Sequence, residues 1–516
     1  MTLPPPTLPP PTLPPLPRHP ALFQINTRVL LRRLGDEANG VVTLDGIPDS
    51  LLDGLQERGF DWIWFLGVWR TGEAGRAVSR TEPGWQAGFR AALPDLCEAD
   101  IVGSPFAITG YEVDPLLGDE AALERLRRRL HARSLRLMLD FVPNHMAPDH
   151  PWVRDKPEMF VQGTAEDMAR EPGNWFQSAP DGPVLARGRD PYFPGWPDTA
   201  QLDYSRPETR AAMTGVLRSV AERCDGVRCD MAMLMLPDVF GRTWGRWLGG
   251  REMVPFWPDA ITAARAVSPG FTLMAEVYWG LEDQLLSNGF DLAYDKALYD
   301  GLRDADAGRV RFLLTGGEEK QDRRARFLEN HDEPRAAAVF PWPKQRAAAL
   351  ATFASPGLRF FHQGQFEGMR VHIPIHLDRG PQEPADDRIA AFYARLLEAL
   401  REPALRDGRH EELTPLAAWE GNPSHGNLIC ALWHGDDGAA FLRVVNLSTD
   451  RAQCRVRFGD GGGGDWLLRD RLGPETYRRT ARELFEPGLF LDLPGWGTNL
   501  FALSRAAADP ALTEAS

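Results

Sequence analysis

Carboxyl side chains stand at the ends of three separate apolar runs of the chain. Asp230 follows GVRC, Glu276 follows FTLMA, and Asp332 closes the segment ARFLENHD. Cleavage of a glycosidic bond needs two carboxyl groups in different states, one ionised at the reacting carbon and one protonated beside the leaving oxygen. The three acids therefore indicate glycoside chemistry, provided that the fold brings the ends of these runs together.

The surroundings of two of these acids suggest different roles for them. Arg228 lies two residues before Asp230, so in a strand both side chains point to the same face. A neighbouring guanidinium favours the ionised carboxylate, which suits Asp230 to act as the nucleophile. Glu276 lies within the apolar and aromatic segment MAEVYW. Burial in such a setting raises the pKa of a carboxyl group, which suits Glu276 to act as the acid/base.

Further polar side chains occur at the same run ends. His145 and His331 can donate hydrogen bonds to sugar hydroxyls, and Asp332 can bind a pair of hydroxyls and stabilise positive charge near the reacting carbon. A single Asp at a strand end is more often a turn or cap residue. The functional interpretation therefore depends on the whole set, its order and its placement at successive strand ends.

Elements able to position these residues follow from the apolar pattern. Short apolar runs separated by helical stretches are typical of buried parallel strands, and eight of them favour an α/β fold of the (β/α)8 TIM-barrel type. An active site is expected at the carboxyl ends of such strands. We expect strands within residues 21–31, 61–69, 135–143, 226–234, 271–279, 290–298, 325–333 and 358–365. We expect helices at residues 121–132, 208–222, 344–353 and 387–400.

Changes in composition predict the domain organisation. The interval after the third run, rich in Pro, Gly, Asp and Trp, is too long for a simple connection, and short β-like segments replace the α/β pattern near residue 402. The predicted parts are a Pro-rich disordered tail at 1–20, a barrel at 21–145 and 206–402, an inserted domain at 146–205, a C-terminal antiparallel β-sandwich at 403–508 and a tail at 509–516.

Composition also excludes several classes of partner. The formal net charge of −14 argues against nucleic acid or an anionic membrane as the main partner. The chain has no apolar run of membrane-spanning length and no secretory signal pattern at its start. Its five cysteines are not in metal-ligand spacing, which predicts a reduced, cytoplasmic setting. The oligomeric state stays open.

Four segments resemble the core motifs of the α-amylase superfamily, glycoside hydrolase family 13. They are DFVPNH (140–145), GVRCDMAML (226–234), MAEVYW (274–279) and FLENHD (327–332). The resemblance implies a retaining double displacement on α-glucosidic bonds, with Asp230 as nucleophile, Glu276 as acid/base and Asp332 as transition-state stabiliser. It also implies substrate-binding roles for Arg228, His145 and His331, and for Tyr111 in TGYEVDP, which is similar to an aromatic residue that stacks on the sugar.

The chain also departs from the family pattern. Many starch-degrading members carry Lys-His shortly after the nucleophile, whereas here Met231 to Leu234 follow it. This difference favours short α-glucans or small α-glucosides over long starch chains. Asn144 and Asp203 match positions that bind calcium in some members, although calcium needs about six to eight oxygen ligands. No cofactor is expected to be required, and calcium is a candidate ligand.

Several alternatives remain at this point. Hydrolysis and transfer share one glycosyl-enzyme intermediate, so the chain could instead move a glucosyl or maltosyl unit to a sugar or to a phosphorylated acceptor. A phosphorylated acceptor could be bound by four charged or imidazole side chains in the loop after the eighth run, Arg370, His372, His376 and Arg379. The favoured interpretation of these residues is that they form loop ion pairs or are surface groups. A catalytically inactive carbohydrate-binding protein is the remaining alternative.

Overall fold

The computed structural model describes residues 13–459 and 463–506. The predicted tail at 509–516 and most of the predicted tail at 1–20 lie outside the described residues. The last residues of the latter segment are ordered, contrary to the prediction of disorder up to residue 20. Arg18 forms ion pairs with Glu318 and Asp322, and His19 is buried.

Eight parallel strands form a closed barrel, as the apolar runs predict. Around the barrel the strand order is β1-β15-β14-β13-β12-β11-β5-β2. All five residues of β2 and all five of β15 are buried, which explains why these strands read as continuous apolar runs. The strands are β1 (Ala21–Asn26), β2 (Trp62–Leu66), β5 (Arg136–Phe141), β11 (Gly226–Cys229), β12 (Thr272–Ala275), β13 (Leu292–Tyr294), β14 (Arg324–Arg326) and β15 (Leu358–His362).

Several strands end before the apolar runs do, and the first run shows why. β1 ends at Asn26, whose side chain accepts a hydrogen bond from the backbone N–H of Val29 and caps the helix that follows. The second half of that run is therefore helical, whereas the apolar pattern predicted a single strand. After β11, the backbone likewise turns away at Met231, which has a left-handed conformation with φ +43°.

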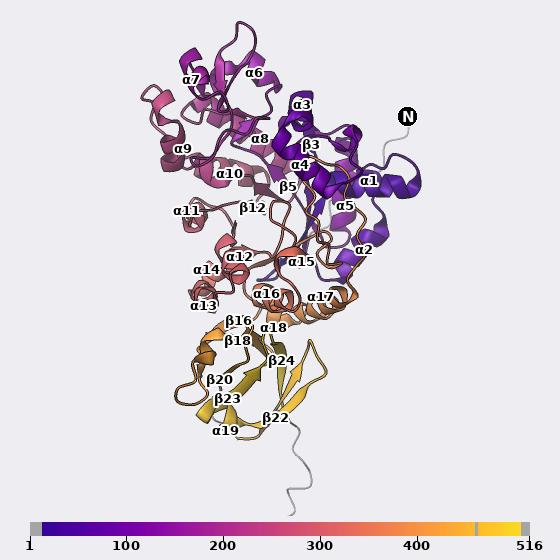
Figure 1. The fold of residues 1–516 in the computed structure, drawn as a ribbon, viewed down its shortest axis with the longest axis vertical. Helices are drawn as coiled ribbons and strands as arrows, with labels where there is room; N and C mark the ends of the chain where they lie inside the picture. Colours follow the sequence, from indigo (N-terminus) through magenta and orange to yellow (C-terminus); the bar gives the residue numbers. More distant parts are fainter. Residues whose placement is uncertain (1–12, 460–462, 507–516) are drawn as a thin grey trace, which may run out of the picture. The chain divides into compact units, whose positions relative to one another are not determined.

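The helices connect the strands and flank the inserted segment (Figure 1). Two predicted helices, at 344–353 and 387–400, have the predicted bounds, and the other two differ by one residue at each end. None of the helices in the described part of the chain combines the length and apolarity that a membrane span requires. The helices are α1 (Thr27–Ala38), α2 (Asp49–Glu57), α3 (Glu73–Thr81), α4 (Pro83–Ala92), α5 (Glu120–His131), α6 (Pro151–Asp155), α7 (Ala165–Arg170), α8 (Pro207–Arg223), α9 (Pro237–Trp244), α10 (Trp257–Val267), α11 (Glu282–Ser287), α12 (Lys296–Arg303), α13 (Ala307–Leu314), α14 (Glu318–Asp322), α15 (Ala336–Val339), α16 (Lys344–Phe353), α17 (Asp387–Leu400), α18 (Pro403–Arg406) and α19 (Ala481–Glu483).

Short antiparallel sheets lie outside the barrel, in the long segments that follow β2 and β5. β3 pairs with β4, β10 pairs with β6, and β7, β9 and β8 form a three-stranded sheet. The segment after β5 thus carries small sheets of its own, as its length led us to expect. These strands are β3 (Trp69–Thr71), β4 (Ile108–Val113), β6 (His145–Met146), β7 (Gln162–Gly163), β8 (Trp175–Gln177), β9 (Val184–Ala186) and β10 (Ala200–Gln201).

Two antiparallel sheets at the C-terminal end form the predicted sandwich, drawn in orange to yellow in Figure 1. One has the order β16-β18-β19-β24-β21-β22 and the other β17-β20-β23. Leu442 and Val444 of the first sheet share an apolar core with Cys454 and Leu491 of the second. The strands are β16 (Arg409–Leu413), β17 (Leu416–Ala417), β18 (Leu428–His434), β19 (Ala440–Asn446), β20 (Ala452–Val456), β21 (Asp465–Asp470), β22 (Thr476–Thr480), β23 (Leu489–Leu493) and β24 (Thr498–Arg505).

By its internal contacts the chain divides into two compact units. The first consists mainly of Leu22–Tyr294 and His372–Gln382, and the second mainly of Asp295–Val371 and the residues from Glu383 onward. This division differs from the predicted domain limits, which were drawn by fold type and which stay a prediction.

Candidate active site

Two of the three predicted acids leave neighbouring barrel strands at the same end. Asp230 comes directly after β11 and Glu276 directly after β12. The ladder continues past both strand ends, because the backbone N–H of Glu276 donates to the carbonyl of Cys229 at 3.1 Å and that of Asp230 donates to Phe141 at 2.8 Å. Both carboxylates are thus fixed by main-chain hydrogen bonds at the carboxyl end of the barrel strands, where sites of this fold are built.

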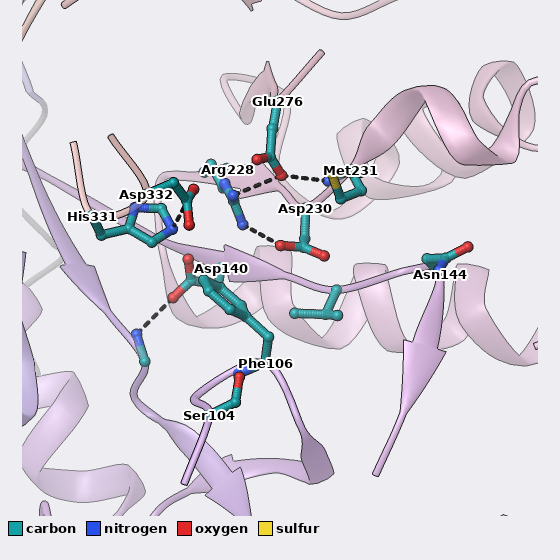
Figure 2. A network of polar contacts seen from close by, with 12 residues as sticks. Ser104, Phe106, Asp140, Asn144, Arg228, Asp230, Met231, Glu276, His331 and Asp332 are labelled. Atoms are coloured by element: carbon teal, nitrogen blue, oxygen red, sulfur yellow. Dashed lines mark hydrogen bonds and ion pairs between the residues drawn. The ribbon is translucent and has the colours of Figure 1, made fainter. Parts of the chain in front are cut away.

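One guanidinium group binds both carboxylates (Figure 2). Arg228 Nη1 lies 2.6 Å from Asp230 Oδ1, and Arg228 Nη2 lies 2.7 Å from Glu276 Oε2. The side chains of all three residues are at most 7% exposed. The rigid, planar donor set of arginine can hold two acceptors at a fixed separation, so Arg228 sets the distance between the two acids.

This geometry corrects the sequence-based reasoning about Arg228. Its proximity was interpreted as a feature that distinguishes Asp230 from Glu276, but the guanidinium contacts both. The two acids differ instead in their other partners. Glu276 also accepts from the Met231 backbone N–H at 2.6 Å and from the Tyr278 hydroxyl at 2.8 Å. Within the described residues, Oδ2 of Asp230 has no hydrogen-bond partner, which leaves this oxygen available to a substrate.

A third carboxylate supports this part of the site from β5. Asp140 Oδ2 accepts from the backbone N–H of Gly67 at 2.7 Å, and Oδ1 accepts from Trp64 Nε1 at 3.1 Å. Burial raises the pKa of Asp140 to about 7, against the opposing effects of the Arg228 charge and of these hydrogen bonds. Because each of its oxygens accepts a hydrogen bond from the protein, Asp140 is assigned a structural role.

Like Arg228, two further predicted substrate-binding residues belong to the same compact unit as Asp230. The Tyr111 hydroxyl donates to the carbonyl of Val142 at 3.0 Å and accepts from its N–H at 2.9 Å, which fixes the ring beside Trp69 and Phe141. His145 is buried, and burial lowers its pKa although the Asp230 charge acts in the other direction. A neutral imidazole there can both donate and accept hydrogen bonds.

The other two predicted residues follow β14 in the second unit. His331 Nε2 lies 3.1 Å from Asp332 Oδ2, and the Asp332 side chain is 37% exposed (Figure 2). The side-chain oxygen of Asn330 accepts from the backbone N–H groups of Asp332 and Glu333 at 2.8 and 2.9 Å. Asn330 therefore shapes the turn that presents Asp332.

Asn144 and Asp203 do not fit a calcium site. Asn144 Oδ1 accepts from the Gln201 amide at 3.0 Å. Asp203 Oδ2 lies 2.6 Å from Arg251 Nη2, and Oδ1 accepts from the backbone N–H and hydroxyl of Ser205. Protein donors thus contact the oxygens that would bind the ion, and a guanidinium charge opposes a divalent cation. Among the described residues there is also no cluster of three or more His, Cys, Asp or Glu suited to a metal.

The charged loop after β15 is partly structural. Arg379 forms ion pairs with Asp95 and Asp100, at 3.1 and 2.8 Å, which confirms the loop ion pair. His376 is buried rather than at the surface. Its Nδ1 lies 2.9 Å from the Ser79 hydroxyl and its ring lies against Trp85. These two residues are therefore engaged within the protein and are not available to read an acceptor.

An exposed aromatic pair was missed by the sequence-based reasoning. Trp279, three residues after Glu276, is 40% exposed and has a φ of +63°, a backbone conformation that bulky residues rarely adopt. Its ring packs edge-on against Tyr192, which is 60% exposed, with 5.0 Å between the ring centroids. Exposed aromatic faces of this kind bind the apolar C–H faces of sugars. The only sequence signal was the turn-forming Asp190, which caps the backbone of Tyr192 at 2.7 Å.

Comparison with known proteins agrees with this geometry. Residues 35–287 match the family model of the α-amylase catalytic domain. Alpha-amylase 3 of Dictyoglomus thermophilum is 23% identical over 299 residues, covering 54% of this chain and 56% of that protein. Alpha-amylase MalA of Haloarcula japonica is 27% identical over 361 residues, covering 68% of this chain and 49% of that protein. The chain thus spans about half the length of these relatives.

The fold has close structural neighbours as well. The crystal structure of the maltogenic α-amylase AmyB from Thermotoga neapolitana superposes with a TM-score of 0.67, at 18% identity, over 94% of this chain and 98% of that one. At that identity the likeness concerns the fold. The match to the family model places residues 35–287 in the α-amylase family of glycoside hydrolases and transglycosidases.

Proposed function

We propose that the chain is a retaining glycosidase or transglycosidase that cleaves α-glucosidic bonds in short α-glucans or small α-glucosides. The observation that carries this proposal is the bridge that Arg228 forms between Asp230 and Glu276. Retaining enzymes hold their two carboxyl groups about 5–5.5 Å apart, whereas inverting enzymes leave room for a water with about 6.5–9.5 Å. Two carboxylates on neighbouring strand ends that bind one guanidinium agree with the short separation of retaining enzymes, and the family match adds the support for retention.

In the proposed mechanism, Asp230 attacks the anomeric carbon while Glu276 protonates the leaving oxygen. The glycosyl-Asp230 ester that forms is then released by water or by an acceptor hydroxyl, with Glu276 acting as the base. Arg228 binds both side chains and so holds Asp230 in place relative to Glu276. Asp332 is assigned the stabilisation of positive charge on the sugar ring, in line with the motif that it occupies.

Substrate-binding roles are proposed for further residues at or near the strand ends. His145 and His331 hydrogen-bond to sugar hydroxyls, and Tyr111 stacks on the ring that is cleaved. Trp279 and Tyr192 add an exposed aromatic surface for a further ring. The family match and the burial of His145 beside Asp230 support these assignments.

The turn after the nucleophile supports the preference for small substrates. Ala232, Met233 and Leu234 are buried, and the segment holds apolar side chains where Lys-His is frequent in starch-degrading members. The turn therefore offers no charged or imidazole side chain to a leaving group. A long glucan would therefore gain few polar contacts at this turn, whereas a short substrate does not depend on such contacts.

The product profile from maltoheptaose tests the proposal. Wild type is expected to release glucose or maltose if it hydrolyses, and to form products longer than the substrate if it transfers. Asp230→Asn is expected to abolish both, whereas Asp437→Asn, the same change at an exposed position of the β18–β19 turn, is expected to leave the profile unchanged. Full activity of Asp230→Asn would overturn the assignment of the nucleophile. Inactivity of wild type towards maltoheptaose, sucrose, trehalose and isomaltose would overturn the proposed function.

A further inference from the structure

Different hydrogen-bond environments surround the two oxygens of Glu276. Oε2 lies 2.6 Å from the backbone nitrogen of Met231 and 2.7 Å from Arg228 Nη2. Oε1 accepts a hydrogen bond from the Tyr278 hydroxyl at 2.8 Å. The Glu276 side chain is only 4% exposed, so these contacts with the protein matter more to it than contacts with bulk water.

The two environments differ in how they respond when Glu276 takes up a proton. A backbone N–H and a guanidinium can only donate, so a proton on Oε2 would face two donors and would cost Oε2 at least one of its two hydrogen bonds. A phenol hydroxyl can donate or accept. A proton on Oε1 therefore keeps its hydrogen bond, because Tyr278 can reverse direction and accept from Glu276.

The local backbone makes this contact a consequence of the fold. Tyr278 lies two residues after Glu276 on the extension of β12, so both side chains leave the chain on the same side. The Glu276 carbonyl accepts from the Ala232 backbone N–H at 3.0 Å, which holds the extension against the turn after β11. The left-handed backbone of Met231, with φ +43°, is part of the same turn.

We propose that Tyr278 is a positioning residue for the acid/base, and that Glu276 transfers its proton through Oε1. This inference rests on the proposed function. In the first half-reaction, Oε1–H gives its proton to the glycosidic oxygen as the bond from the anomeric carbon to that oxygen breaks and the bond to Asp230 forms. In the second, the attacking water or sugar hydroxyl gives a proton back to Oε1 as the bond to Asp230 breaks.

Tyr278 remains protonated throughout this cycle and exchanges no electrons or atoms with the substrate. It accepts from protonated Glu276 in the free enzyme. When the glycosidic oxygen of a bound substrate takes over the proton on Oε1, the hydroxyl turns and donates to Oε1, and it keeps donating to the carboxylate after the transfer. The hydroxyl thus keeps Glu276 in one orientation in both protonation states, while Met231 and Arg228 hold the other oxygen in place.

The substitution Tyr278→Phe tests this assignment with two substrates that need acid assistance to different extents. Maltoheptaose has a poor leaving group that must be protonated, whereas α-glucosyl fluoride releases fluoride, which needs little help. We expect kcat/KM for maltoheptaose to fall about 10- to 100-fold, within the range of general acid catalysis, and kcat/KM for the fluoride to change by less than about threefold. KM for maltoheptaose and Tm should stay near the wild-type values.

Tyr477→Phe serves as the matched control, because it removes the same hydroxyl group from an exposed residue of β22. It should leave both substrates and Tm unaffected. An equal loss of kcat/KM on both substrates with Tyr278→Phe, or no loss on either, would overturn the role of Tyr278 but would leave the proposed function standing. A wild type that turns over neither substrate would overturn the proposed function, and this inference with it.

Discussion

Asp230 and Glu276 are bound to the same guanidinium group, at 2.6 and 2.7 Å from the two terminal nitrogens of Arg228. Each acid comes from the end of a different strand, so the bridge ties β11 to β12 at the point where the proposed chemistry takes place. The relative placement of the two acids thus depends on a single side chain.

Arg228→Lys should therefore lower kcat/KM by about 100-fold or more, a loss of the size seen when one preorganised donor is removed from an active site. A lysine keeps the charge, but its single ammonium cannot replace a planar fork that holds two acceptors at once. Steady-state kinetics on an α-glucoside, with circular dichroism as a check on folding, measure this effect. Arg125→Lys, at the ion pair with Asp45, is the matched control and should behave as wild type.

Much of the framework that places these residues could be predicted from the sequence. The helices at 344–353 and 387–400 were predicted correctly because their apolar spacing is regular, and the second also begins at a capping Asp386. Each predicted strand exists because its run is buried in the barrel. The ends of the strands were less predictable, since one side chain, that of Asn26, is enough to start a helix inside an apolar run.

The pairings within the site could not be predicted in the same way. Arg228 reaches Glu276 only because β11 and β12 pair with Arg228 beside Met274, a register that no local pattern specifies. Asp203 binds Arg251, 48 residues further along the chain, so the motif that suggested calcium gave no sign of the competing cation. Long-range polar contacts depend on the folded arrangement, whereas periodicity reports only local structure.

The backbone of Met231 yields a second prediction. Its left-handed conformation brings its N–H to 2.6 Å from Glu276 Oε2, and a β-branched residue adopts this conformation only at a cost of about 1–3 kcal/mol. Met231→Val should therefore reduce kcat about tenfold, whereas Met231→Gly, which is free of that strain, should stay within about threefold of wild type. Equal kcat values for the two variants, at equal Tm, would rule out a role for the turn.

Calcium should have no effect on this protein. Arg251 and Ser205 already contact the carboxylate of Asp203, so an added cation would have to displace a guanidinium at 2.6 Å. Differential scanning fluorimetry with EDTA and then with millimolar CaCl2 should give the same Tm within about 1 °C. A Tm that rises with calcium concentration, as mass action requires of a bound ligand, would show that the site does accept the ion.

Asp225 provides a test of stability away from the reacting groups. Its carboxylate is bound by Arg127 at 2.6 Å and by His131 at 2.8 Å, and it accepts from the backbone N–H of Leu137 at 2.7 Å. Burial tends to raise its pKa, but the hydrogen bonds from His131 and Leu137 and the Arg127 charge outweigh this and lower it. Asp225→Asn should cost about 3 kcal/mol of unfolding free energy at pH 7, because it leaves buried donors without their charged partner.

The pH dependence of that cost follows from the direction of the shift. A carboxyl group whose pKa is lower in the folded than in the unfolded state stabilises the protein above its unfolded pKa of about 3.9, and this contribution is lost as the pH falls through the folded pKa. Urea unfolding of wild type and Asp225→Asn should therefore give curves well separated at pH 7 and converging below about pH 4. A gap that stays constant down to pH 3 would mean that the carboxylate charge contributes nothing and that the substitution acts through packing alone.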